Sequence, residues 1–409
     1  MANIMQDCQT CQKKFLIIDS EQKFLQEKGI GFPKSCPSCR QAKRLFLRGN
    51  ERKLYKTKCQ KCGKEIIVAF DPSSVGHKIF CNEDYKKYYW EADLIIQDPL
   101  PKNISTEFFF KELKRIILSH PKNPTHTLNS ENCDYGDQLY WCKNLINCFD
   151  SVNCSDSLYL FDCEMMANCI DCDFCVECDL IYESVDAHKC FNCEFLEDSY
   201  NMRDSSYCTS CRDCHDVFGC VQLNSKSYCI FNRQLAPEEY RQQIKKYKSM
   251  AAQKILAILD DLKKRFPVTQ AKGMNNENCP YCNYLYNSVN CYYCFDGIKN
   301  ENCAYIYDSG DNKYCFDSTF TTECELSYEF LDSAQLFNCS FIIYSDKSQD
   351  SLYLVSCDDI KSSLGCVNLN HKQYCILNRQ LNKEEYDRIS LNILNQLKEV
   401  NLGWHNLIF

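Results

Sequence analysis

Cysteines near the N-terminus have the types and spacing of metal ligands. Cys8 and Cys11 form one C-x2-C pair, and Cys36 and Cys39 form a second pair after 24 intervening residues. Four thiolates in two such pairs suit a tetrahedral zinc site that closes a small zinc ribbon. A catalytic zinc site keeps one coordination position open, so a complete set of four cysteines predicts a structural site.

A second set of candidate ligands follows directly. Cys59 and Cys62 form another C-x2-C pair, and Cys81 begins a further pair whose last position is occupied by Asp84. Asp84 has the right position for the fourth ligand, whereas His77 offers the commoner imidazole donor but lies four residues before Cys81. Both are candidates, and a degenerate ribbon held by packing alone is the alternative. Together the two sets predict two zinc ions.

The residues between the first two pairs must bring these pairs together. The segment 15–32, FLIIDSEQKFLQEKGIGF, predicts a strand, a turn and a short helix over residues 21–28, and Gly29 and Gly31 allow the chain to turn back. The string C-x2-C-x3-F…E-Q-x-F…K-G…P-x-x-C-P-x-C-R resembles the probable zinc-ribbon family of bacterial proteins over residues 7–44. This resemblance implies zinc binding and no particular reaction.

Charge is distributed unevenly along the chain. Residues 1–66 contain 15 Lys and Arg against 6 Asp and Glu, a net charge of +9, and the remaining residues carry 32 against 49, or −17. A basic head on an acidic body suggests a nucleic-acid partner, although a solvated lysine-rich surface has the same composition. The candidate phosphate contacts are Lys43, Arg44, Arg48, Arg52 and Lys53. The alternative partner of the head is another protein.

The rest of the chain contains a long internal repeat. Residues 219–240, GCVQLNSKSYCIFNRQLAPEEY, return as residues 365–386, GCVNLNHKQYCILNRQLNKEEY, with 16 of 22 positions identical. The same offset of 146 residues pairs Cys148 with Cys294. We therefore predict two homologous domains in tandem.

A shorter period of six residues runs through each copy. From Ile146, the hexads INCFDS, VNCSDS and LYLFDC continue in register to FGCVQL at residues 218–223. The third place holds cysteine or a large apolar residue, the sixth is mostly small, and the second and fifth are rich in Asn, Asp and Glu. A cysteine that exchanges with Leu, Ile and Met behaves as a small buried hydrophobe. Most of the 34 cysteines are therefore expected in a core rather than in metal sites.

Inward small or apolar residues that alternate with polar ones at a period of six are typical of a β-solenoid, in which short strands stack coil on coil. At three hexads per coil, the 78 residues 146–223 predict about four coils. A helix would need a period of 3.6 residues, which this pattern contradicts.

Two further cysteine patterns compete with a purely structural core. The spacing of an iron–sulfur run is found in Cys169, Cys172, Cys175 and Cys178. Cys211, Cys214 and His215 have the spacing of a haem attachment motif. All these cysteines fall on places three and six of the hexads, which favours a core role. Metal or redox chemistry on the thiol ladder of the first copy is a further alternative.

Helices are predicted between and after the repeats. The run TEFFFKELKRIILSH ends before Pro121 and carries an apolar face of the kind that docks on a core. Each copy ends in a helix, which begins at Pro237 in the first copy and after an Asn382 cap in the second. The apolar stripe from Tyr240 to Leu262 would cover an open solenoid end. The Asn-Arg-Gln triplets that precede these helices are expected to hydrogen-bond the exposed edge.

These elements divide the chain into five segments: a zinc ribbon (1–50), a second zinc-ribbon-like knuckle (51–92), a helical connector (93–130) and two β-solenoid copies with capping helices (131–270 and 271–409). This order resembles a group of uncharacterised bacterial cysteine-rich proteins with an N-terminal probable zinc-ribbon domain. The resemblance covers nearly the whole chain and implies zinc binding and layout only.

The fold class is therefore predicted to be mainly β. An apolar signal segment and membrane-spanning stretches are lacking, so we expect a cytoplasmic protein with reduced thiols. Metalloprotease, phosphate-loop and hydrolase motifs are also lacking. We predict a zinc-binding, non-enzymatic scaffold or interaction protein, with RNA or DNA binding through the basic head as the alternative.

Overall fold

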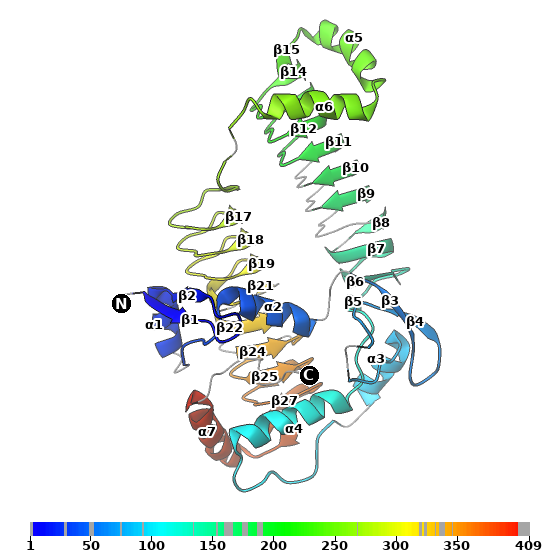
Figure 1. The fold of residues 1–409 in the computed structure, drawn as a ribbon. Helices are drawn as coiled ribbons and strands as arrows, with labels where there is room; N and C mark the ends of the chain where they lie inside the picture. Colours follow the sequence, from blue (N-terminus) through cyan, green and yellow to red (C-terminus); the bar gives the residue numbers. More distant parts are fainter. Residues whose placement is uncertain are drawn as a thin grey trace.

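The computed structural model describes residues 3–27, 31–48, 53–73, 76–91, 94–133, 135–152, 154–158, 167–173, 179–185, 191–267, 269–318, 321–322, 325–331, 333–334, 340–345 and 347–399. Two small N-terminal modules and a helical connector precede a long β-solenoid (Figure 1). In the described part of the chain, no helix combines the length and the apolar composition needed to cross a membrane.

Each N-terminal module consists of an antiparallel hairpin followed by helix. The first module contains β1 (Ile4–Asp7), β2 (Lys14–Ile17), α1 (Asp19–Glu27) and α2 (Pro37–Arg48). The second contains β3 (Tyr55–Lys58), β4 (Glu65–Val68) and α3 (Asn82–Glu91). Helix α1 lies close to where the sequence predicts a short helix, over residues 21–28.

The connector contains one helix, α4 (Thr106–Ser119). Ser105 caps its N-terminus, because the Ser105 side chain accepts a hydrogen bond from the Phe108 N–H at 3.1 Å. The helix ends before Pro121, as the sequence predicts. The predicted docking face is also confirmed, since the buried side chains are Phe109, Phe110, Leu113, Ile116 and Ile117.

The solenoid begins with a first coil stack, which we define as residues 127–234. Its strands form one eleven-stranded sheet in chain order. They are β5 (Thr127–Leu128), β6 (Tyr135–Tyr140), β7 (Lys143–Val152), β8 (Ser155–Leu158), β9 (Ala167–Asp173), β10 (Asp179–Val185), β11 (Phe191–Glu197), β12 (Ser206–Thr209), β13 (His215–Phe218), β14 (Ser227–Ile230) and β15 (Arg233–Gln234).

A second coil stack, residues 273–380, has shorter sheets on its separate sides. One side contains β16 (Gly273–Met274), β17 (Asn283–Tyr286), β18 (Phe295–Ile298), β19 (Tyr307–Gly310), β21 (Thr321–Thr322) and β23 (Ser333–Ala334). Another contains β20 (Lys313–Phe316), β22 (Glu325–Leu331), β24 (Ser340–Ile343) and β25 (Leu352–Val355). The pairs β26 (Asp358–Lys361) with β27 (Asn370–Gln373) and β28 (Cys375–Ile376) with β29 (Arg379–Gln380) complete the stack.

Stacked strands pair in parallel with an offset of twelve residues. Lys143 pairs with Ser155 in the first stack, and Phe295 pairs with Tyr307 in the second. One coil is therefore twelve residues long, or two hexads. The prediction of three hexads per coil is wrong, and a 78-residue stretch corresponds to six and a half coils of this length rather than to four.

The short coil follows from a backbone corner at every third residue. Asp198, Asn201 and Asp204 have φ angles of 48°, 52° and 49°, and the spacing continues along both stacks. Asn and Asp tolerate this left-handed conformation better than most residues. Gly219 occupies one corner at φ 64°, where a Cβ would lie 2.3 Å from the Phe231 ring of the next coil. The polar second and fifth places of the hexads are these corners, so two hexads supply four corners.

The inward residues fill the core and also bind the backbone. Cys208 is fully buried, and its thiol donates to the Ser206 carbonyl at 3.3 Å. Ser205 has an equivalent inward place, where its hydroxyl donates to the Arg203 carbonyl at 2.8 Å. Of the solenoid cysteines whose side chains the structure describes, all except Cys279 are buried. The prediction that these thiols belong to a core is confirmed for the described residues.

Helices follow each stack. After β15, α5 (Pro237–Lys248) and α6 (Ala252–Lys263) pack Tyr240 and Ile255 into a cluster with Phe218 and Ile230. The sequence predicts one continuous stripe here, whereas the chain bends between these two helices. After β29, α7 (Lys383–Glu399) begins next to Asn382, whose side-chain oxygen accepts the Glu385 N–H at 2.9 Å.

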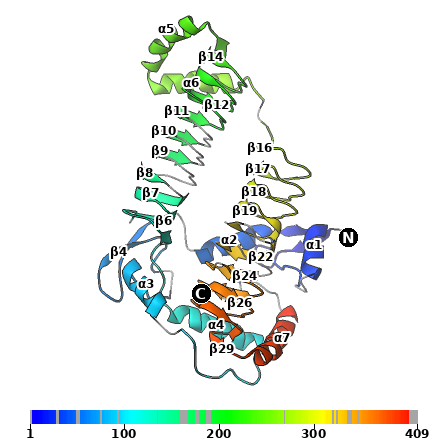
Figure 2. The ribbon, with the colours of Figure 1, turned by 180° about the vertical axis from the view of Figure 1, so that it is seen from behind.

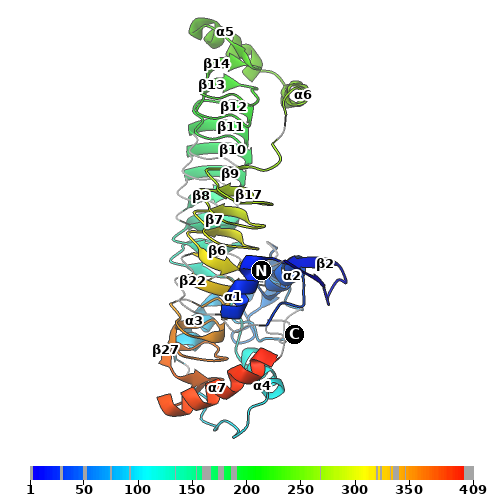
Figure 3. The ribbon, with the colours of Figure 1, turned by 90° about the vertical axis from the view of Figure 1, so that its left-hand side faces the viewer.

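The two stacks lie side by side and run in opposite directions (Figures 1 and 2). The first leads away from the N-terminal modules to α5 and α6, and the second returns to end beside α4 and α7. The first module lies against the second stack (Figure 3). One buried cluster joins Leu25 of α1, Phe109 of α4, Tyr353 of the second stack and Ile393 of α7. The first module is therefore packed onto the solenoid.

Candidate metal centres

The first hairpin forms a tight turn that presents Cys8 and Cys11. The Cys8 N–H donates to the Lys13 carbonyl and the Gln12 N–H donates to the Cys8 carbonyl, both at 2.9 Å. Gln12 has a φ of 63°, which closes this turn. Cys36 and Cys39 lie at the start of α2, so the helix brings the second pair to the first.

The four sulfur atoms of Cys8, Cys11, Cys36 and Cys39 lie within 4.8 Å of one another. The Cys11 and Cys36 sulfurs are 3.8 Å apart. A tetrahedral zinc with Zn–S bonds of about 2.3 Å requires sulfurs about 3.8 Å apart, so the donor set fits this ion. All four donors come from the protein, which leaves no position for a substrate.

Backbone hydrogen bonds prepare one of these thiols to act as a thiolate. Burial by itself raises the pKa of Cys8, but the N–H groups of Cys36, Cys11 and Thr10 outweigh it and lower the pKa to about 6. The Cys36 N–H donates to the Cys8 sulfur at 3.2 Å. Zinc binds the deprotonated thiolate, so this arrangement favours metal binding at neutral pH.

The second hairpin repeats this geometry. The Cys59 N–H donates to the Lys64 carbonyl at 2.8 Å, and the Gly63 N–H donates to the Cys59 carbonyl at 2.9 Å. Gly63 takes the left-handed position with a φ of 78°. The Cys81 N–H then donates to the Cys59 sulfur at 3.2 Å, as the Cys36 N–H does to Cys8. The two modules therefore have matching ligand frameworks.

Asp84 is placed with the second set of cysteines. Ligand atoms of Cys59, Cys62, Cys81 and Asp84 lie within 4.8 Å of one another. The Asp84 Oδ2 lies 3.2 Å from the Cys81 sulfur, and hydrogen bonds from the three thiols lower the pKa of Asp84 to about 2. His77 lies elsewhere, with its Nδ1 3.4 Å from the His120 carbonyl oxygen. The geometry thus places Asp84 with the three cysteines, as its position in the sequence predicts, and His77 outside the cluster.

A buried charged group links the first metal cluster to the solenoid. Arg40 follows Cys39 directly, and its guanidinium contacts Glu21 at 3.1 Å and Asp317 of the second stack at 2.8 Å. The three side chains are only 3%, 1% and 0% exposed. Arg40 also lies over the Tyr305 ring, with 5.4 Å to its centroid. Sequence reasoning missed this triad because Asp317 is far away in the chain, so the motif that contains Glu21 and Arg40 does not show that they share a buried partner.

The candidate nucleic-acid contacts are only partly described. Lys43, Arg44 and Arg48 belong to α2, but their side chains lie outside the described residues, as does Arg52 altogether. Lys53 is exposed. Further exposed lysines surround the two hairpins and were not among the predicted contacts. They are Lys13, Lys34, Lys56, Lys58 and Lys64.

Where the structure describes the other cysteine motifs, their side chains belong to the solenoid core. Cys211 and Cys214 point into the core with 0% and 2% exposure, and the neighbouring His215 pairs with Asp216 at 3.0 Å. This geometry agrees with a core role for the haem-like motif. The side chains of the iron–sulfur-like run, Cys169, Cys172, Cys175 and Cys178, lie outside the described residues.

The Asn-Arg-Gln triplets cap the last coils as the sequence predicts. Asn232 exchanges two hydrogen bonds with the Val221 backbone at 2.7 and 2.8 Å, and Asn378 does the same with Val367 at 2.8 Å. The two arginines differ: Arg379 binds Glu112 of α4 at 2.9 Å, whereas Arg233 is exposed.

Comparisons with known proteins recognise the first module. A family model described as a probable treble clef domain matches residues 4–45. This description agrees with α2 at the second cysteine pair, where a zinc ribbon would have another hairpin, and so refines the prediction. No curated protein matches the chain.

Among solved structures, a UDP-N-acetylglucosamine acyltransferase from Campylobacter jejuni matches with 8% identity and a TM-score of 0.09. The match covers 69% of this chain and 94% of that one. A TM-score this low supports no conclusion about fold or activity.

Proposed function

We propose that this protein is a zinc-binding, non-enzymatic scaffold whose N-terminal modules engage a partner and whose solenoid holds them in place. The observation that supports this most directly is the closed donor set of each cluster. Four protein ligands surround each centre, which is the arrangement of structural zinc sites rather than catalytic ones. The ions that these clusters select are proposed to be zinc because thiolate-rich tetrahedral sites favour it.

We also propose that the solenoid consists of two tandem copies, as the repeat of residues 219–240 at residues 365–386 suggests. The caps support this proposal, since Asn232 and Asn378 make the same hydrogen bonds to the coil before them. The two copies would have different roles. The first stack would extend away from the modules, whereas the second carries the first module through Arg40 and Asp317.

The scaffold proposal is tested with the Cys39→Ser variant of the full chain. Because the folding free energy of such a module is largely metal-binding free energy, we expect residues 4–45 to become sensitive to protease while the solenoid stays resistant. Affinity purification from native extracts should then lose the partners that the wild type retains. The Cys279→Ser variant, altered at a half-buried solenoid thiol, is the matched control. Equal partner recovery from both variants would contradict the proposal.

A second candidate function is binding of RNA or DNA by the N-terminal modules. The observation that favours it is the group of exposed lysines around the hairpins, for example Lys56, Lys58 and Lys64 on the second. Lysines contact phosphates through charge and release counterions, so binding would weaken steeply with salt.

Fluorescence anisotropy with a single-stranded oligonucleotide tests this second function. Replacing Lys56, Lys58 and Lys64 together by Gln should lower the slope of log K against log salt by about 2, from about 0.7 per lost contact. The same replacement at three exposed lysines of α5, Lys245, Lys246 and Lys248, should leave the slope unchanged. Equal effects of the two triple variants would rule out specific binding by the modules.

A further inference from the structure

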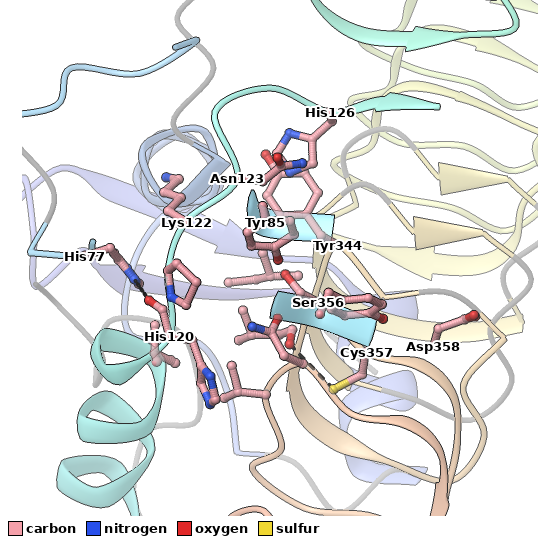
Figure 4. Close-up of a pocket in the computed structure, with 17 residues that line it drawn as sticks. His77, Tyr85, His120, Lys122, Asn123, His126, Tyr344, Ser356, Cys357 and Asp358 are labelled. Carbon is pink, nitrogen blue, oxygen red and sulfur yellow. Dashed lines mark hydrogen bonds between the residues drawn. The ribbon is translucent and has the colours of Figure 1, made fainter. Parts of the chain in front are cut away.

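A cavity of about 320 Å³ lies where three parts of the chain meet (Figure 4). One wall belongs to the second module, through α3 and the loop before it. Another belongs to the connector after α4, and the third is the outer face of the second coil stack. A volume of this size is at the lower end of the range for small-molecule sites and suits a molecule the size of a mononucleotide.

The walls of this cavity are flat and aromatic. The rings of His126 and Tyr344 stack with centroids 4.0 Å apart and planes 20° from parallel. Tyr85 and Tyr89 line the cavity from α3 and stack on each other at 6.3 Å. Aromatic surfaces like these bind planar ring systems, because every base presents a π-face that stacks without sequence-specific contacts.

The polar groups of the cavity lie at opposite ends. Lys122 and His77 lie at one end and Asp358 at the other (Figure 4). The Lys122 ammonium lies over the Phe70 ring, 4.1 Å from its centroid. Burial lowers the pKa of Lys122 to about 8, so the side chain is still mostly cationic at neutral pH. This end of the cavity therefore suits an anionic group.

At the opposite end, two polar atoms are turned into the protein. The Asp358 Oδ1 is buried and receives no hydrogen bond from the residues that the structure describes. The His126 Nδ1 is likewise buried without a hydrogen bond, although it lies 3.4 Å from Asp137. Protein atoms cover both of these atoms, so neither faces the cavity, and the charged group that can meet a ligand here is Lys122.

We propose that this cavity binds a purine mononucleotide. The ring lies against Tyr344 and Tyr85, and the phosphate approaches Lys122. The second metal cluster supports the site indirectly, because Asp84 and Tyr85 are neighbours at the start of α3. The scaffold function does not require this ligand, so the two proposals stand or fall separately.

Isothermal titration of the full-length, metal-containing protein with AMP and with GMP tests the proposal. We expect one mononucleotide to bind per chain. The Lys122→Met variant should bind it at least about tenfold more weakly, because a charge-assisted contact is lost. Adenosine has no phosphate and should bind the wild type and this variant equally. The Tyr344→Ala variant should weaken both AMP and adenosine, because it removes a stacking surface.

The control is Lys361→Met, which removes an exposed lysine from the same coil stack outside the cavity and should leave AMP binding unchanged. Tyr344→Leu provides a second, milder change in case Tyr344→Ala destabilises the fold: it keeps an apolar side chain but removes the stacking ring, so it should also weaken AMP binding. The proposal is overturned if neither AMP nor GMP binds at millimolar concentration. It is equally overturned if the cavity variants bind as tightly as the Lys361→Met control.

Discussion

The triad of Glu21, Arg40 and Asp317 should be the strongest polar link between the first module and the solenoid. The Arg40→Met variant keeps most of the side-chain volume but removes the ion pairs of Arg40 with Glu21 and Asp317. Their side chains are 1% and 0% exposed, so neither can turn to water without opening the interface. Removing one partner of a buried ion pair costs about 3–5 kcal/mol, and we expect a loss of this size here.

Part of this cost is offset by protonation. Burial already raises the pKa of Glu21 to about 7, even though Arg40 acts against this shift. Without Arg40 we expect Glu21 to be neutral in the folded protein at pH 7, so the remaining cost comes from Asp317, which loses its ion pair with Arg40 while it stays buried. The Glu21→Leu, Arg40→Met and Asp317→Leu triple variant should therefore recover most of the lost stability, since it removes all three charges of the triad.

Hydrogen exchange measured by mass spectrometry is a suitable assay, because it reports the opening of α1 and of strand β20 separately from the rest of the chain. A loss of 3 kcal/mol corresponds to exchange more than about a hundredfold faster in these segments. The control is Arg241→Met, which breaks an exposed pair with Glu238 (3.8 Å) and should cost less than about 1 kcal/mol. If Arg40→Met accelerates exchange no more than Arg241→Met does, the triad does not hold the module on the solenoid.

Three further predictions concern the solenoid and the connector. The Cys208→Ser variant should be more stable than Cys208→Val by about 1 kcal/mol in chemical denaturation, because Ser retains the hydrogen bond to the Ser206 carbonyl. A more stable valine variant would show that this core position favours an apolar side chain. The Gly219→Ala variant should melt at a lower temperature than the Gly63→Ala variant, because both glycines have positive φ but only Gly219 lies against a neighbouring ring; equal melting temperatures would show that this contact relaxes freely. Burial lowers the pKa of His120 from 6.5 to about 4, so this residue should reduce the stability of the folded state as the pH falls from 6.5 toward 4, by about 2–3 kcal/mol in total. The His120→Gln variant should lack this part of the pH dependence, and an unchanged pH profile in that variant would contradict the assignment.

The metal clusters were predictable because their ligands are set by local spacing. A C-x2-C pair on a hairpin turn and a second pair one helical turn apart, such as Cys36 and Cys39, place donors close together in nearly any context. The position of Asp84 was predictable for the same reason, since it occupies the place that Cys39 has in the first module. His77 shows that the type of donor alone does not predict a ligand. Imidazole is the commoner zinc ligand, but the loop places His77 next to the His120 carbonyl instead of the cluster.

The solenoid class was predictable from the hexads, but the coil length was not. The polarity of Asn and Asp at places two and five predicts outward side chains, whereas in the structure Asn201 and Asp204 mark left-handed corners. Three residues per side and four sides per coil follow once these residues are recognised as corners. The triad and the cavity could not be predicted from the sequence, because Asp317 and Tyr344 meet the N-terminal modules only through the packing of distant segments.

We infer that two kinds of cysteine coexist in this chain: ligands in two N-terminal clusters and hydrogen-bonded core thiols in the solenoid. Metal analysis of the full-length protein, purified without added metal, tests it most directly. We predict two zinc ions in the wild type, one in Cys39→Ser, one in Cys81→Ser and none in the double variant. Iron with acid-labile sulfide, or zinc retained by the double variant, would contradict it by showing that solenoid thiols bind metal.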